Sequence, residues 1–194
     1  MVEAKDFKKI KNLIAERIKK LFGHAIILGS DSDLNKNRLT HTNSILIHKD
    51  INNIRPLQGA APGLSNEEIS MSLEIFFESV KYVKFWSQTD KIIIIHIPSP
   101  ISSYTWNEPI NYEIIGSEEV GTTSNKKNFS NSIFIRNKIK DFSLKNGIEF
   151  LDLTKHIFEN GKQSVLHGPM DWRHLNYDGY EKAANFIISK LKNN

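Results

Sequence analysis

Hydrophobic positions in this chain follow helical spacing in some segments and form short unbroken runs in others. Helical spacing predicts helices in the segments 6–21, 66–83, 130–145 and 178–191. Apolar runs predict strands in the segments 24–28, 44–48, 54–58, 91–98 and 148–153. The run at 91–98, KIIIIHIP, is apolar on both alternating faces, which favours a central parallel strand that is covered on both sides.

The order of these elements indicates the fold class. Strands that alternate with helices favour an α/β protein with three layers, α/β/α, around an open and mostly parallel sheet. A chain of 194 residues is long enough for one well-buried domain, so we expect a single domain over residues 1–194, with an N-terminal helix within residues 1–22. In such sheets the active site lies at the carboxyl ends of the strands, here after Leu28, Gln58, Ile97 and Leu153.

Composition narrows the class of protein. Hydrophobic residues make up 39% of the chain and charged residues 25%, which is ordinary for a globular domain. No apolar run approaches the roughly 20 residues that a membrane span needs, and the N-terminus lacks the apolar stretch of a secretory signal. We therefore expect a cytoplasmic protein, or an excised domain, with no membrane span. The chain has no cysteine, which excludes disulfides and thiolate chemistry.

The charge distribution bears on partners. The formal net charge is +4, but the lysines are spread over helix faces and are interleaved with acidic residues. A nucleic-acid footprint is concentrated and comes with a recognisable module, so we expect no nucleic-acid partner. Apart from Asp171 and His174, no close group of histidines and acids has metal-ligand spacing. We expect neither a metal nor a cofactor.

The strongest candidate for chemistry is the block GPMDWRHLNYDG at residues 168–179, directly before the last predicted helix. It resembles the last block of the SGNH (GDSL-like) hydrolase superfamily, in which an Asp and a His three residues apart precede the closing helix. The resemblance implies a flavodoxin-like sheet and a catalytic pair. His174 would be the general base, and Asp171 would orient and stabilise its imidazole ring.

The nucleophile is sought directly after the first strand, where that superfamily has Gly-Asp-Ser. This chain has LGSDSD at residues 28–33. Ser32 follows Asp31 and so keeps the Asp-Ser order, which makes it the implied nucleophile. Ser30 is the alternate, because it lies closer to Gly29. Either serine needs a base within hydrogen-bond reach to become nucleophilic.

The oxyanion hole of the superfamily uses a backbone amide from a glycine after the second strand and an Asn side chain after the third. Gly59 is the first choice for the amide and Gly63 the second, because glycine permits close approach of the backbone to a bound acyl group. The Gly-x-Asn-Asp block is not recognisable here. Asn52, Asn53 or Gln88 would have to substitute, and Asn53 is the residue that we assign.

The resemblance implies a serine esterase or acyl hydrolase that acts on a small-molecule or carbohydrate acyl ester, such as a carbohydrate O-deacetylase or an acetyl-transferring domain. Two alternatives stay open. One is a non-catalytic SGNH-like domain that binds a glycan or a protein. The other is a nucleotide-type mutase, because GSDSD after a strand is similar to the phosphate-binding start of the carboxyaminoimidazole ribonucleotide mutase family.

Aromatic residues stand on the polar segment 99–128, which is long for a loop. Tyr104, Trp106 and Tyr112 either stack against a sugar or anchor the segment to the core, and the sequence favours neither reading. His48 and His96 lie within or at the ends of predicted strands, so we interpret both as packing residues.

Overall fold

The computed structural model describes residues 42–54, 56–57, 64–89, 91–113, 120–168 and 173–192. Several sequence predictions lie outside these residues. They are the helix at 6–21, the strand at 24–28 and the candidates Ser30, Ser32, Gly59, Gly63 and Asp171.

The first sheet has three antiparallel strands in the order β2-β1-β4. Strands β1 (Asn43–Ile47) and β2 (Asp50–Ile54) form a hairpin, and β4 (Thr105–Asn107) pairs with the other edge of β1. The hairpin turns through His48 and Lys49, whose φ angles are 50° and 70°. Positive φ at both central residues is the geometry of a tight two-residue hairpin turn.

The second sheet holds the longest apolar run of the sequence. Strand β3 (Ile93–His96) pairs in parallel with β7 (Glu149–Asp152), so that His96 lies beside Asp152 in the register. The third sheet is the antiparallel pair of β5 (Ile110–Glu113) and β6 (Val120–Thr123).

The predicted fold class is wrong. Among the strands that the structure describes, β3 and β7 form the one parallel pair of a named sheet, and the others are antiparallel in small sheets, without a mostly parallel, flavodoxin-like sheet. The error has a physical origin. The predicted run at 44–48 forms β1, but its hairpin partner is β2, a segment that the sequence does not predict as a strand and that shares only Ile54 with the predicted run at 54–58. The polar segment after Pro98 supplies β4, β5 and β6 instead of a loop.

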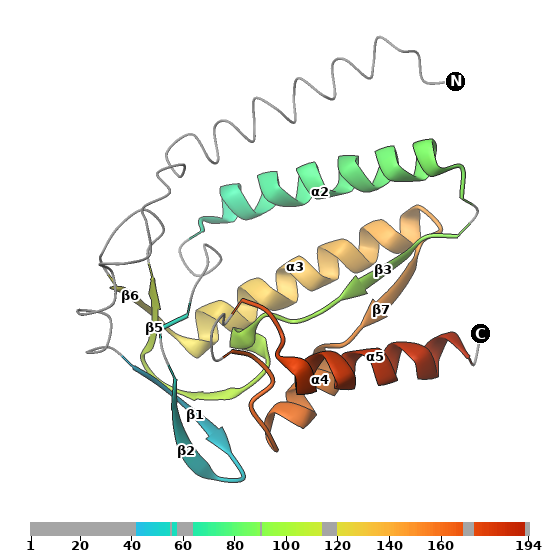
Figure 1. The fold of residues 1–194 in the computed structure, drawn as a ribbon. Helices are drawn as coiled ribbons and strands as arrows, with labels where there is room; N and C mark the ends of the chain where they lie inside the picture. Colours follow the sequence, from blue (N-terminus) through green and yellow to red (C-terminus); the bar gives the residue numbers. More distant parts are fainter. Residues whose placement is uncertain are drawn as a thin grey trace, which may run out of the picture.

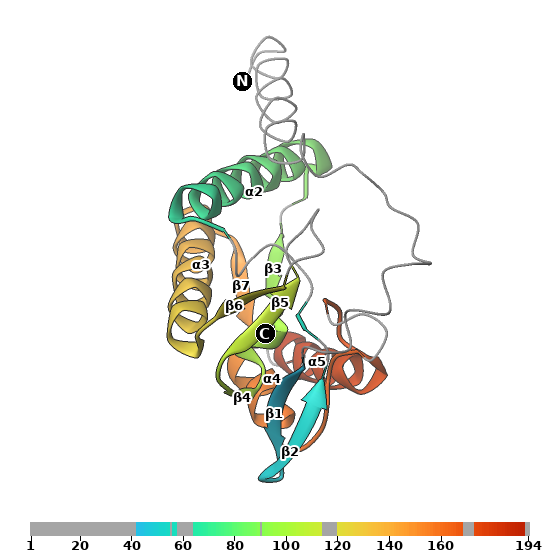
Figure 2. The same cartoon turned by 90° about the vertical axis from the view of Figure 1, so that its left-hand side faces the viewer.

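The helices flank the β3–β7 pair. They are α2 (Asn66–Ser87), the short η3 (Pro100–Ser102), α3 (Asn125–Lys145), α4 (Thr154–Gly161) and α5 (Tyr177–Leu191). Helix α3 lies on one side of the pair, α4 and α5 lie on the other, and α2 lies outside α3 (Figures 1 and 2). A stacked pair of rings, Phe77 and Phe142, joins α2 to α3 with centroids 4.3 Å apart. Of the described helices, none is long and apolar enough to cross a membrane.

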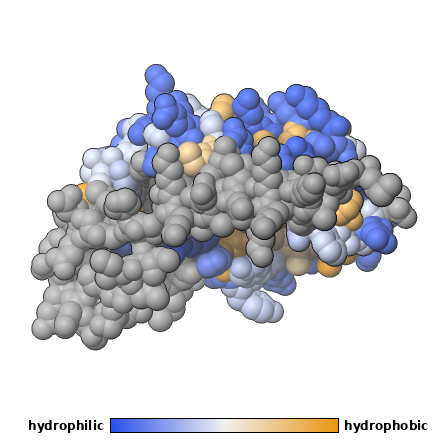
Figure 3. Space-filling view, turned by 90° about the horizontal axis from the view of Figure 1, so that it is seen from above, coloured by the Kyte–Doolittle hydropathy of each residue, from blue (hydrophilic) through white to orange (hydrophobic). Residues whose placement is uncertain are grey.

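The apolar core lies where β1, β4 and β5 meet β7, α4 and the segment before α5. Its fully buried side chains are Ile45, Ile110, Leu153, Ile157 and Leu166. On the face seen in Figure 3, the described surface is mostly hydrophilic, with scattered hydrophobic residues. At the edge of this core lie the carboxyl ends of β3 and β7, with His96 and Asp152, and the chain continues from them into η3 and α4.

Candidate functional site

The turn before α5 presents His174 at the surface. Leu175, the next residue, is buried and forms an antiparallel bridge with His167. Asn176 caps α5: its side-chain oxygen accepts a hydrogen bond from the Gly179 backbone N–H at 3.0 Å. Its side-chain amide donates to the Val165 carbonyl at 2.8 Å. His174 is therefore an exposed side chain next to a firmly anchored backbone.

The glycine of the same block has a packing role. Gly179 is buried at the start of α5, and a Cβ atom at this position would collide with the carbonyl oxygen of Leu166. That carbonyl also accepts the backbone N–H of Asn176 at 2.8 Å. Leu175, Asn176 and Gly179 thus have packing or capping roles that explain the sequence around His174.

The remaining predicted site residues have different outcomes. Ser30, Ser32, Gly59, Gly63 and Asp171 lie outside the described residues. Asn53 is described on the exposed hairpin strand β2, where its side-chain oxygen accepts the Ser44 hydroxyl at 2.8 Å. This pair gives Asn53 a cross-strand role, and its part in an oxyanion hole stays a prediction.

Sequence reasoning missed a polar cluster at the carboxyl ends of β3 and β7. The carboxylate of Asp152 accepts two hydrogen bonds from Thr154, at 2.9 Å from the backbone N–H and 2.6 Å from the hydroxyl. His96 Nδ1 lies 3.2 Å from the Thr154 hydroxyl and 3.4 Å from Asp152 Oδ1. On the other side, Arg136 Nε of α3 lies 3.7 Å from Asp152 Oδ2. His96 is thus part of a network and not simply a packing residue.

This network fixes the tautomer of His96. The Thr154 hydroxyl has one hydrogen, and the short contact to Asp152 uses it. Toward His96 the same hydroxyl can only accept, so Nδ1 carries the ring proton. Nε2 is then left with its lone pair on the opposite edge of the ring, and this nitrogen can accept a hydrogen bond or a proton.

Burial and charge set the protonation states of the pair. Desolvation lowers the pKa of His96, and this effect outweighs the opposing pull of the Asp152 carboxylate. Partial burial alone would raise the pKa of Asp152, but the hydrogen bonds from Thr154, together with His96 and Arg136, bring it below its ordinary value. At neutral pH the pair is therefore a neutral imidazole beside a carboxylate.

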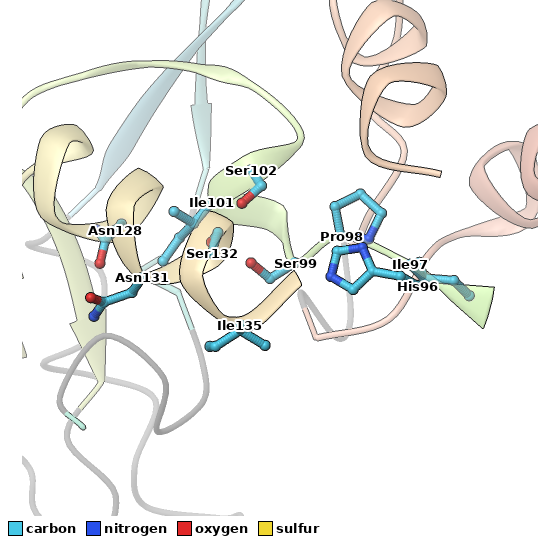
Figure 4. Close-up of a pocket in the computed structure, with 10 residues that line it drawn as sticks. All are labelled: His96, Ile97, Pro98, Ser99, Ile101, Ser102, Asn128, Asn131, Ser132 and Ile135. Atoms are coloured by element: carbon cyan, nitrogen blue, oxygen red, sulfur yellow. The ribbon is translucent and has the colours of Figure 1, made fainter. Parts of the chain in front are cut away.

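A pocket of about 180 Å³ opens beside His96, between the segment 96–102 and the first half of α3 (Figure 4). Two polar atoms at this pocket are buried without a hydrogen-bond partner among the described residues: the Ser102 hydroxyl and the side-chain nitrogen of Asn128. The Asn128 side chain is oriented by Thr123, whose hydroxyl donates to its oxygen at 3.3 Å. Unpaired buried polar groups are uncommon in folded proteins and require an explanation.

A second hollow, of about 310 Å³, lies on the other side of Ile101 and Ser102. Phe129 and Phe158 contribute to its lining, and Phe129 is exposed. The two hollows share Ile101 and Ser102, so that they form neighbouring depressions along the face where η3 meets α3.

Two aromatic residues of the segment after Pro98 are anchors. The Tyr104 hydroxyl accepts the Leu166 backbone N–H at 2.7 Å and bonds to His167 Nδ1 at 2.9 Å. Trp106 is buried and donates its indole N–H to the Ile101 carbonyl at 3.0 Å. Burial raises the pKa of Tyr104 to about 12 and lowers the pKa of His167 to about 4. These rings hold the segment on the core.

In the described part of the chain, no group of three or more histidines and acidic residues could hold a metal ion. No protein-family model, curated protein or solved structure matches this chain. The function is therefore argued from the anchored turn at His174 and from the network at His96.

Proposed function

We propose that the protein is a serine-type acyl-ester hydrolase of the SGNH kind, with His174 as its general base. The observation that carries the proposal is the anchored turn. Leu175, Asn176 and Gly179 each have a packing or capping role, and they leave the imidazole of His174 exposed at a defined position. A general base has to be held in place and remain accessible to substrate, and this turn meets both requirements.

The reaction follows from the roles that the resemblance assigns. His174 takes the hydroxyl proton of Ser32, or of Ser30 as the alternate, while the serine oxygen attacks the acyl carbon. The tetrahedral intermediate collapses and the alcohol leaves with the proton from His174. Water then attacks the acyl-enzyme with His174 again as the base, which releases the acid and restores the serine. Asp171 stabilises the imidazolium that forms in each half of the reaction.

The substrate class is an acyl ester of a small molecule or a carbohydrate, with acetyl as the acyl group that we expect. Backbone amides at Gly59 or Gly63 and the side chain of Asn53 are the proposed donors to the oxyanion. The proposal needs no cofactor, since serine, histidine and water complete the reaction.

A chromogenic ester assay tests the proposal. In His174→Asn the rate of p-nitrophenyl acetate hydrolysis, measured as kcat/KM, is expected to fall about 100- to 10,000-fold, because a positioned base contributes about that factor. The matched control is His48→Asn, which removes another exposed histidine at the β1–β2 turn. The control should keep the parent rate. Equal rates in the parent and in His174→Asn, with both folded by circular dichroism, would contradict the proposal.

A further inference from the structure

The pocket beside His96 is a candidate binding site separate from the described residues of the proposed hydrolase reaction. Of the residues assigned to that reaction, the structure describes His174 and Asn53, and neither is among the described residues that line the pocket. The pocket is framed by the segment 96–102 from one side and by α3 from the other, and Figure 4 shows the Ser99 and Ser102 hydroxyls on the side that faces α3. Three properties of the pocket select its ligand: the hydrogen-bonding groups and the charge of its lining, and its size.

Two buried polar groups at the pocket have no hydrogen-bond partner among the described residues. Ser102 is 5% exposed and Asn128 is 3% exposed, yet the Ser102 hydroxyl and the Asn128 amide nitrogen have no partner among the described residues. Leaving such groups unpaired costs free energy, which a ligand that hydrogen-bonds to them would recover. Among the described residues, the lining therefore carries unused N–H donors at Asn128 and a hydroxyl at Ser102 that can donate and accept.

The charge of the lining selects against ions. Among the described residues that line the pocket, none is a lysine, arginine, aspartate or glutamate. Burial lowers the pKa of His96, so the imidazole is neutral near pH 7. Arg136 Nε and Asp152 Oδ2, close to His96, lie 3.7 Å from each other. The described lining therefore offers an anion no cation and a cation no carboxylate.

Size and shape favour a single ring. A closed cavity of about 150 Å³ admits benzene, so a pocket of about 180 Å³ that opens to the surface has room for part or most of one sugar ring. Ile101 and Ile135 supply aliphatic surface that can pack against the C–H face of such a ring. The mixture of donors and acceptors matches hydroxyl groups, because each hydroxyl both donates and accepts.

From these properties we infer that the pocket between the segment 96–102 and α3 binds a neutral sugar ring, with Ser102 and Asn128 as its hydrogen-bonding partners. The neighbouring hollow, which the exposed ring of Phe129 and the side chain of Lys126 help to line, extends the same face and offers room for a second unit of an oligosaccharide. The inference does not rest on the hydrolase proposal, since the two use different residues.

Titration of the full chain with glucose, galactose, mannose and N-acetylglucosamine, followed by nuclear magnetic resonance, tests the inference. At least one of these sugars should bind in the millimolar range and shift the signals of Ser102, Asn128 and His96. Ser102→Ala should weaken that binding about 3- to 10-fold, which is the value of one hydrogen bond. Its melting temperature should not fall, because the Ser102 hydroxyl has no partner in the described structure.

Ser143→Ala is the matched control. Ser143 is also a fully buried serine, but its hydroxyl donates to the Ile139 carbonyl within α3 and does not line the pocket. This variant should bind as the parent does. Asn128→Asp is the second test variant, because it keeps the oxygen that Thr123 needs and removes the N–H donors.

Three results would overturn the inference. One is the absence of any saturable shift with all four neutral sugars. Another is equal affinity in Ser102→Ala, Asn128→Asp and Ser143→Ala. The third is binding of glucuronic acid or glucosamine at least as tightly as the neutral sugars, because the pocket would then select charge. The ester assay on the same samples is independent, so failure of sugar binding and failure of the hydrolase proposal can be told apart.

Discussion

The turn before α5 and the carboxyl ends of β3 and β7 use polar residues in opposite ways. In the turn, the oxygen and the nitrogen of the Asn176 side-chain amide both form hydrogen bonds with the backbone. The Tyr104 hydroxyl and the His167 ring close by form a hydrogen bond with each other. At the strand ends, Asp152 and Thr154 are paired, but Ser102 and Asn128 beside the pocket keep unpaired polar atoms within the described structure. The turn before α5 therefore supports one exposed side chain, that of His174. The region at the strand ends is a pocket in which some hydrogen-bonding groups are unused.

The difference shows how two kinds of site are built. A site made from one block of sequence needs neighbouring residues that hold the backbone in place. Leu175, Asn176 and Gly179 do this for His174 by packing and capping. A pocket made from distant segments needs only that the fold brings them together, as it does for His96 of β3 and Asn128 of α3. Substitutions in the turn should therefore cost more stability than substitutions at the pocket.

The largest expected effect is the loss of stability in acid, from His167 beneath the turn. Burial lowers the folded pKa of His167 from 6.5 to about 4. Below pH 6.5 the unfolded chain takes up a proton that the folded chain does not, so the free energy of unfolding falls as the pH drops from 6.5 toward 4. The loss reaches about 3 kcal/mol in total.

Urea denaturation at pH 7 and pH 5 measures this effect. His167→Gln is the comparison, because glutamine can still accept the Tyr104 hydroxyl and does not titrate. The parent should lose about 2 kcal/mol more than the variant between the two pH values. The same change in both proteins would show that His167 is not buried as described.

A smaller loss is expected from Gly179→Ala, which adds a Cβ against the Leu166 carbonyl. The clash forces the start of α5 away from the turn and should cost about 1 to 3 kcal/mol in the free energy of unfolding. Asn185→Ala, at an exposed position of the same helix, should change it by less than about 0.5 kcal/mol. Equal stability of the two variants in urea would show that the turn is not tightly packed on α5.

The smallest effect on stability is expected at the carboxyl ends of β3 and β7. Asp152→Asn keeps an oxygen for Thr154 and removes only the charge, so stability should change by less than about 1 kcal/mol. The carboxylate raises the pKa of His96 against desolvation, and its removal should lower that pKa further. Titration of the His96 ring by nuclear magnetic resonance measures the shift. A higher pKa in the variant would contradict the arrangement.

The sequence predicted the elements around β3 and β7 better than their assembly. The apolar runs at 91–98 and 148–153 contain β3 and β7, and helical spacing located α2, α3 and α5. It did not reveal the hairpin, because its turn is His48-Lys49 and lacks the glycine or asparagine that usually marks positive φ. The sequence also did not predict β4, β5 and β6, because the polar composition of the segment after Pro98 is typical of a loop.

For the candidate site residues, too, the sequence predicted what is local in the chain and missed what the fold brings together. The block at residues 168–179 could be recognised because its members are neighbours in the chain. His96 and Asp152 were missed, because each ends an apolar run and His96 was interpreted as a packing residue. Ser102 and Asn128 could not be found, because nothing in their local sequence indicates that their polar atoms stay unpaired after folding.

The central claim is that His174 activates a serine, and labelling with a fluorophosphonate probe tests it most directly. The probe reacts with serines that a base has made nucleophilic. The parent protein should be labelled on Ser32, as read by mass spectrometry of its peptides. Labelling should be lost in Ser32→Ala and in His174→Asn, and it should persist in Ser30→Ala and His48→Asn. An unlabelled parent that is folded by circular dichroism, or equal labelling of the parent and His174→Asn, would contradict the account.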